Sequence, residues 1–130
     1  MIREQQKILV VDDEKTMRDF VQRVLDSAGY HVITASNGQE ALDKISKFDV
    51  SLVLLDIMMP GLDGFEVLER IPPDLNIPVI MLSGISDENT KIESLGLGAD
   101  DFIEKPFSIN ELLTRIQVKL RRTKPRQVEK

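Results

Sequence analysis

The segment LVLLDIMMPGLDGFEVLERIPP, residues 52–73, contains the pattern of one complete strand–loop–helix unit. Its first residues, 52–55, form a short continuous run of branched aliphatic side chains, which is typical of a strand buried on both faces. Asp63 followed three places on by Glu66 marks a helix start, and two prolines bound that helix at its end. We therefore predict a buried strand that leads into an acidic residue, Asp56, and a helix that begins directly after Asp63.

The same alternation of apolar runs and amphipathic stretches continues on both sides of this segment. Two other runs are nearly as apolar as the first, and two shorter, more polar runs predict strands nearer the edges of a sheet. The expected strands are residues 8–11, 31–35, 52–55, 77–82 and 101–103, of which the second and the last are the polar ones. Five strands separated by helices predict an α/β domain with a doubly wound parallel sheet and right-handed crossovers.

Apolar residues recur at helical spacing in the segments between the expected strands. The residues expected to face the core are Phe20, Val21, Val24 and Leu25 in the first segment, Ala41, Leu42 and Ile45 in the second, and Leu112, Leu113, Ile116 and Leu120 in the last. A short polar residue followed three places on by Glu predicts helices that begin near residues 38, 64 and 109. A fourth helix is expected from about Asp87, and Gly96 and Gly98 close it.

The composition indicates one soluble globular domain. Hydrophobic residues make up 42% and charged residues 30% of the 130 residues, and a chain of this length can bury a core without disulfides. No apolar run approaches membrane-spanning length, and residues 1–7 lack the apolar stretch of a secretory signal. Because the sequence also contains no cysteine, we expect a cytoplasmic protein.

Acidic residues follow two of the expected strands at the point where each strand ends. Asp12 and Asp13 come directly after the first strand, and Asp56 follows the third. For the strand order 2-1-3-4-5 the winding reverses between these two strands, and ligands bind at the carboxyl edge there. Because neighbouring carboxylates repel one another, a cation is needed to keep all three ionised, and Mg²⁺ prefers such oxygen ligands. The alternative is that each residue is a strand-end or helix-cap acid.

Two further polar residues are expected at the same edge of the sheet. Lys105 follows the fifth strand and would add positive charge, and Ser83 ends the fourth strand with a hydroxyl group. Taken alone, a loop lysine is usually solvated, and a serine before glycine is usually a turn residue. Together with the acids they provide a cation site, a carboxylate nucleophile and partners for phosphoryl oxygens, which predicts phosphoryl transfer.

Five motifs resemble those of one protein family. They are VVDDE (10–14), LLDIMMPGLDGFEVL (54–68), MLSG (81–84), GADDFIEKPF (98–107) and ELLTRIQVKLRR (111–122). From Lys7 to about Arg122 the chain resembles the receiver domains of two-component response regulators, and it is most similar to the OmpR-type receivers. The resemblance implies a flavodoxin-like fold, with five parallel strands in the order 2-1-3-4-5.

The resemblance implies a role for each residue of the predicted site. Asp56 would be the phosphoacceptor for a sensor histidine kinase, and Ser83 and Lys105 would hold the phosphoryl oxygens. The ligands of Mg²⁺, or of Mn²⁺ in its place, would be Asp12, Asp13, Asp56 and the backbone carbonyl of Met58. The domain would catalyse its own phosphorylation and autodephosphorylation on Asp56, and it would not be an enzyme for other substrates.

The resemblance also implies a conformational switch. Ser83 would move toward the phosphoryl group, Phe102 would turn inward into the vacated space, and the peptide bond before Pro106 would be cis. The face formed by helix 4, strand 5 and helix 5 would then form a phosphorylation-dependent homodimer. The charged residues that could form salt bridges there are Lys91, Glu93, Asp100, Asp101, Glu111, Arg115 and Arg122. The alternative is that they are solvated surface charges.

The carboxyl-terminal residues bear on how the domain is connected. Residues 1–124 are expected to form the receiver domain, and residues 125–130 to begin a linker to an effector domain that binds DNA and controls transcription. The net charge is −5, but residues 119–130 contain six basic residues and one acidic residue, which leaves −10 for the rest. Such an acidic body does not suit direct contact with DNA. The alternative is a free-standing receiver that signals by protein–protein contact, and no membrane contact is expected.

One departure from the family concerns the lifetime of the phosphorylated state. The positions two residues beyond the phosphoacceptor and two beyond the switch hydroxyl are Met58 and Ile85. Both side chains are apolar, and neither can orient an attacking water molecule. We therefore expect slow hydrolysis of phosphorylated Asp56.

Three other functions fit parts of this pattern. A Mg²⁺-dependent phosphatase with an aspartyl-phosphate intermediate would need an acid two places after Asp56, where Met58 stands. A nucleotide or flavin module would need a glycine-rich phosphate loop after the first strand, where three acids stand instead. A receiver-like domain that works without phosphate would lack an acid or the lysine, and none is missing.

Overall fold

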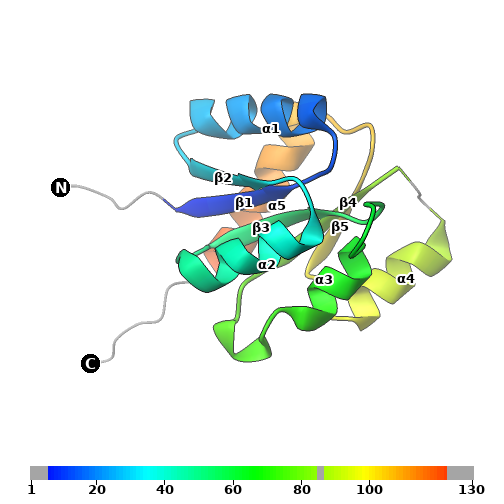
Figure 1. The fold of residues 1–130 in the computed structure, drawn as a ribbon. Coiled ribbons are helices and arrows are strands. Elements are labelled where there is room, and N and C mark those ends of the chain that lie inside the picture. Colours follow the sequence, from blue (N-terminus) through cyan, green and yellow to red (C-terminus); the bar gives the residue numbers. More distant parts are fainter. Residues whose placement is uncertain (1–5, 85–86, 123–130) are drawn as a thin grey trace.

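A parallel sheet of five strands forms the centre of the computed structural model, which describes residues 6–84 and 87–122 (Figure 1). The strands are β1 (Lys7–Val11), β2 (His31–Ala35), β3 (Leu52–Asp56), β4 (Val79–Ser83) and β5 (Asp101–Glu104). They are ordered β2-β1-β3-β4-β5, and all neighbours pair in parallel. The predicted fold class and strand order are confirmed, and the two more polar strands, β2 and β5, are the edges.

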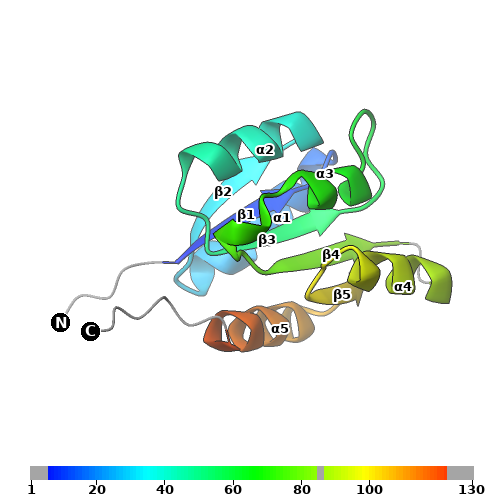
Figure 2. The same ribbon diagram turned by 90° about the horizontal axis from the view of Figure 1, so that it is seen from below.

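Helices cover both faces of the sheet. They are α1 (Lys15–Ser27), α2 (Gly38–Lys47), α3 (Gly64–Arg70), α4 (Glu88–Gly96), α5 (Ile109–Arg122) and the short 3₁₀ helix η1 (Pro73–Leu75). Figure 2 shows α5 on one face of the sheet and α2 and α3 on the other, and α1 lies on the same face as α5. Of the helices in the described part of the chain, none is long and apolar enough to cross a membrane.

Alternation along the strands produces two separate hydrophobic cores. Ile8 and Val10 of β1 point to the face of α1 and α5, where Val21, Leu25, Leu112 and Ile116 are buried. Leu9 and Val11 point to the opposite face and pack with apolar residues of α2 and α3. Because both faces are covered, the central strands need apolar side chains at every position, which explains their continuous hydrophobic runs.

The predicted helix starts at residues 38, 64 and 109 are confirmed, and side-chain caps explain them. Asn37 accepts a hydrogen bond from the Glu40 N–H (2.8 Å), and Ser108 accepts one from the Glu111 N–H (3.0 Å). Asp63 and Glu66 form the complete reciprocal capping box. Each cap satisfies backbone donors that a helix leaves unpaired at its first turn.

Two local predictions are wrong. The fourth strand begins at Val79 rather than at residue 77, because Pro78 has no N–H to donate to the sheet. Phe20 does not face the core but is 36% exposed. The buried face of α1 instead runs through Val21 and Leu25, one helical turn apart, and Phe20 lies on its flank.

Candidate functional site

Three acidic side chains meet at the carboxyl edge of the sheet, where β1 and β3 lie side by side. Asp12 and Asp13 follow β1, and Asp56 is the last residue of β3. One carboxylate oxygen from each residue lies within 4.8 Å of the others. Asp12 and Asp56 are buried, whereas Asp13 is exposed. The structure thus brings together the three acids that the sequence analysis places at this edge.

Lys105 brings a positive charge into this acidic cluster. Its Nζ lies 3.0 Å from Asp12 Oδ2 and 3.4 Å from Asp56 Oδ1. The Lys105 N–H donates to the Ser83 carbonyl (2.8 Å), which fixes the backbone of the lysine beside the end of β4. The Lys105–Pro106 peptide bond is cis, the form that the resemblance implies. One ammonium group therefore bridges two of the carboxylates.

The charges in the cluster shift the acid–base properties of Asp56 and Lys105. Burial and the neighbouring Asp12 carboxylate raise the pKa of Asp56 from 3.8 to about 6, although Lys105 opposes this shift. Burial would lower the pKa of Lys105, but the carboxylates of Asp56 and Asp12 outweigh it and raise that pKa. Lys105 is therefore a permanent cation at neutral pH, and its single charge does not compensate the three acids.

Asp12 is held at both its backbone and its side chain. Its N–H donates to the Ala35 carbonyl (3.2 Å), and its Oδ1 accepts from the Glu14 N–H (2.9 Å). Its carbonyl accepts a hydrogen bond from Arg18 Nη1 on α1 (2.8 Å). This contact of Arg18 could not be predicted from the sequence, because helical spacing does not reveal which backbone carbonyl a long side chain reaches.

The backbone of Asp56 is packed against the start of α3. The Gly64 N–H donates to the Ile57 carbonyl (2.8 Å). A Cβ atom on Gly64 would lie 2.5 Å from the Asp56 carbonyl oxygen and 2.7 Å from the Ile57 Cα. No side chain fits there, so Gly64 lets the helix approach the backbone that carries Asp56. The sequence pattern predicts a helix start at residue 64 but does not predict this contact.

The other predicted site residues surround the cluster at different depths. Ser83 is buried at the end of β4, and Phe102 is partly buried against the core beneath α2 and α3. Lys91 Nζ lies 5.8 Å from the centre of the Phe102 ring. Met58, two residues after Asp56 in the loop after β3, is 59% exposed. The roles of Ser83, Phe102 and the Met58 carbonyl remain predictions.

The donor set of the cluster fits a hard divalent cation. All three converging side chains are carboxylates, and Mg²⁺ takes oxygen ligands, keeps several waters and is usually held by one or two carboxylates. The exposed position of Asp13 leaves the cluster open to solvent on one side. The residues Asp12, Asp13 and Asp56 are therefore chemically suited to hold Mg²⁺.

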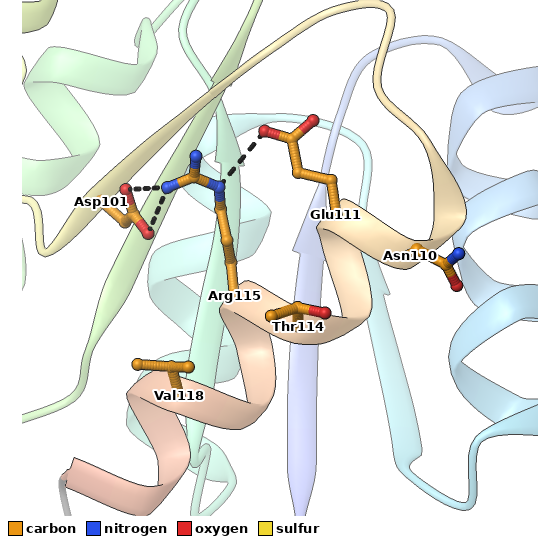
Figure 3. A pocket seen from close by; sticks show the side chains of 6 residues that line it. All are labelled: Asp101, Asn110, Glu111, Thr114, Arg115 and Val118. Carbon is orange, nitrogen blue, oxygen red and sulfur yellow. Dashed lines mark hydrogen bonds and ion pairs between the residues drawn. The ribbon is translucent and has the colours of Figure 1, made fainter.

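The charged face of α4, β5 and α5 is partly paired within the chain. Arg115 donates to both carboxylate oxygens of Asp101 (2.9 and 3.0 Å) and to Glu111 (3.2 Å), at the side of a groove of about 550 Å³ (Figure 3). Lys91 Nζ lies 3.9 Å from Glu104. Two aliphatic residues of α4, Ile92 and Leu95, are exposed. The side chain of Arg122 lies outside the described residues.

Asp100, which the sequence analysis placed among the charges of this face, has a structural role. Its Oδ1 accepts a hydrogen bond from the Val79 N–H (2.9 Å), and its N–H donates to the Val79 carbonyl (2.8 Å). These two bonds join the turn before β5 to the first residue of β4. Asp100 therefore stabilises the edge of the sheet.

Comparison with known proteins identifies relatives over most of the chain. A family model described as the response regulator receiver domain matches residues 8–117. "Probable transcriptional regulator ycf27" of Guillardia theta is 47% identical over 91% of this chain and 46% of its own length. Response regulator RR06 of Streptococcus pneumoniae is 46% identical over 88% of this chain and 53% of its own. The chain thus spans about half the length of the curated relatives it matches.

Solved structures with the same fold are similar over nearly their whole length. The receiver domain of the Francisella response regulator 1452 is 38% identical, with a TM-score of 0.87 over 92% of this chain and all of that chain. The chemotaxis protein CheY4 of Vibrio cholerae is 34% identical, with a TM-score of 0.84 over 88% of this chain and 98% of that chain. The fold, the acidic edge and these matches agree, and the chain belongs to the receiver domain family of two-component response regulators.

Proposed function

We propose that this domain accepts a phosphoryl group on Asp56 from the phosphohistidine of a sensor histidine kinase. The observation that carries the proposal is the position of Asp56, which lies at the carboxyl edge between two further acids and an ammonium group 3.4 Å away. We further propose that the domain catalyses its own phosphorylation and dephosphorylation and acts on no other substrate. The family assignment supports a histidine kinase as the donor.

In the proposed transfer a carboxylate oxygen of Asp56 forms a bond to phosphorus as the bond from phosphorus to the histidine nitrogen breaks. The nucleophile must be ionised, and a pKa of about 6 leaves most of Asp56 ionised at pH 7.5. Lys105 lies close enough to both Asp12 and Asp56 to exchange a carboxylate oxygen for a phosphoryl oxygen with little movement. Its positive charge then stabilises the oxygens of the transferred group.

Asp12, Asp13, Asp56 and the backbone carbonyl of Met58 are the residues that we propose hold Mg²⁺, with Mn²⁺ as a substitute. When bound, the cation supplies positive charge that neutralises the carboxylates and the phosphoryl oxygens. The chain itself fixes the positions of two of these ligands. Asp12 is held by hydrogen bonds of its N–H, its carbonyl and both carboxylate oxygens. Asp56 is held by the close contact of its backbone with Gly64.

Phosphorylation is proposed to change the face of α4, β5 and α5. Ser83 is buried at the end of β4, and Phe102 lies on the neighbouring strand, paired with Met81. A movement of the Ser83 hydroxyl toward the phosphoryl group would vacate space for the Phe102 ring, and a homodimer would then form through this face. The exposed Ile92 and Leu95 supply apolar contact area.

The proposed output is control of transcription through a DNA-binding effector domain, in the cytoplasm. The transcriptional regulators among the relatives are about twice as long as this chain, which supports an effector domain as part of the whole protein. The alternative is a free-standing receiver that signals by protein–protein contact. Its support is the match to 98% of the chain of the chemotaxis protein CheY4.

Incubation with acetyl phosphate tests the proposed chemistry. We expect intact mass spectrometry to show the addition of one phosphoryl group to the wild-type protein in Mg²⁺, and no addition in EDTA or in Asp56→Asn. Asp63→Asn, which changes another acid in the following loop, serves as a control and should be phosphorylated. Phosphorylation of Asp56→Asn, or none of the wild-type protein in any condition, would disprove Asp56 as the acceptor.

The apolar residues two positions after Asp56 and two positions after Ser83 in the sequence lead to a prediction about dephosphorylation. Met58→Asn combined with Ile85→Glu should accelerate hydrolysis by at least about tenfold, because polar side chains at these positions can orient water. Ile85 lies outside the described residues, and Met58 is exposed. The measurement is the decay of phosphorylated protein after removal of acetyl phosphate. The matched control is Met58→Leu with Ile85→Leu, and equal decay rates of the two double variants would refute the prediction.

A further inference from the structure

Arg18 on α1 contacts the backbone of the acidic cluster without contacting any proposed ligand atom. Its Nη1 donates to the Asp12 carbonyl oxygen at 2.8 Å, and its side chain is partly buried. We propose that Arg18 is a positioning residue, which fixes the loop that carries Asp12 and Asp13 so that both carboxylates can hold the cation. This inference rests on the proposed function, because it concerns the affinity of the proposed metal site.

The loop between β1 and α1 lacks the kind of side-chain cap that precedes α2, α3 and α4. Asn37, Asp63 and Asp87 accept hydrogen bonds from the first turns of α2, α3 and α4. At the start of α1 the corresponding residue is Glu14, whose side chain makes no capping hydrogen bond to the described residues. The hydrogen bond from Arg18 instead connects the first turn of α1 to the residue that follows β1.

Arg18 binds the backbone carbonyl of Asp12 and not its carboxylate. This matters because the contacts of the carboxylate are expected to change when a cation binds. Lys105 donates to Asp12 Oδ2 at 3.0 Å, and a cation bound to this carboxylate would compete with Lys105 for the same oxygen. The Arg18 bond acts on the backbone and does not compete for either carboxylate oxygen. It therefore persists through the change and keeps the loop in place.

The charge of Arg18 and its hydrogen bond to Asp12 are expected to affect metal affinity in opposite directions. This difference in direction makes the proposal testable. The Arg18 guanidinium is a cation close to a proposed cation site, so loss of its charge alone would strengthen metal binding. Loss of its hydrogen bond would release the loop and weaken metal binding, as loss of outer partners of metal ligands typically does. The direction of the change in affinity shows which effect is larger.

The experiment is a titration of the full chain with Mn²⁺, followed through the electron paramagnetic resonance signal of the free ion. Arg18→Met should bind Mn²⁺ roughly tenfold more weakly than wild type, and Arg18→Lys should recover part of this loss. Arg23→Met removes the same charge from an exposed position on α1 and should bind like wild type. Circular dichroism of the metal-free proteins establishes that each variant is folded, and Arg18→Lys carries the test if Arg18→Met is not.

The outcomes separate this inference from the proposed function. Unchanged or tighter Mn²⁺ binding by Arg18→Met, or by Arg18→Lys if it carries the test, overturns the positioning role while the metal site stands. A loss of equal size in Arg23→Met also overturns it, because the effect would then come from the charge of the helix. Absence of Mn²⁺ binding by the wild-type protein overturns the metal site itself and this inference with it.

Discussion

Asp56→Asn is expected to stabilise the metal-free protein at neutral pH, and this effect should vanish in acid. In the folded protein the pKa of Asp56 is raised to about 6 from 3.8. Well below pH 3.8 the carboxyl group is protonated in the folded and unfolded states alike and does not affect stability. As the pH rises through 3.8 toward 6, the unfolded state ionises first, so the folded wild-type protein loses stability. The total loss is about 3 kcal/mol, and it is complete above about pH 7.

The asparagine side chain does not ionise in this pH range, so the variant does not lose stability in this way. The difference in unfolding free energy between Asp56→Asn and wild type should grow by about 2.5 kcal/mol between pH 4 and pH 7. Urea unfolding in EDTA at several pH values measures it. Asp74→Asn, in the exposed helix η1, controls for the change in net charge. A constant difference for Asp56→Asn across this range would contradict the raised pKa.

Gly64→Ala is expected to destabilise the protein by about 3 kcal/mol, near the upper end for an overpacked site. The added methyl group would meet the Asp56 carbonyl oxygen at 2.5 Å and the Ile57 Cα at 2.7 Å. Both atoms belong to the backbone at the end of the central strand β3, so they cannot move aside as a side chain can. Either α3 or the segment that carries Asp56 must shift.

Two measurements distinguish this effect from the general cost of replacing glycine. Urea unfolding at pH 7 gives the loss of stability, and the rate of phosphorylation by acetyl phosphate should fall as well, because the nucleophile is displaced. Gly96→Ala is the matched control: a Cβ at the end of α4 meets no atom within 4 Å, and alanine favours a helix over glycine by about 1 kcal/mol. If the two variants are equally stable, the backbone contact at Gly64 does not constrain the fold.

Short-range sequence patterns were sufficient to predict the helices and strands of this fold, because residues close together in the sequence determine where each of them begins and ends. The caps at Asn37, Asp63 and Ser108 use residues three positions apart in the sequence, and the structure contains all three hydrogen bonds. The convergence of Asp12, Asp13 and Asp56 was predictable because parallel strands bring their carboxyl ends to one edge. In these cases the sequence spacing and the spatial arrangement follow from the same geometry.

Long-range contacts could not be predicted in this way. The approach of Gly64 to the backbone of Asp56 depends on how closely α3 packs, and the hydrogen bond from Arg18 depends on the path of a flexible side chain. Phe20 shows the limit of helical spacing: it is apolar and adjacent to the buried Val21, yet it lies on the exposed flank of α1. Which residue of an apolar group is buried depends on the orientation of the helix on the sheet.

The pairing of Arg115 with Asp101 and Glu111 constrains any symmetric association through α4, β5 and α5. The guanidinium already has two carboxylate partners in its own chain, which neutralise its charge and use part of its hydrogen-bonding capacity. A second copy that formed contacts here would therefore gain less from Arg115 than from an unpaired cation. The exposed Ile92 and Leu95 would then supply much of the net affinity, while the charges would determine the alignment of the two copies.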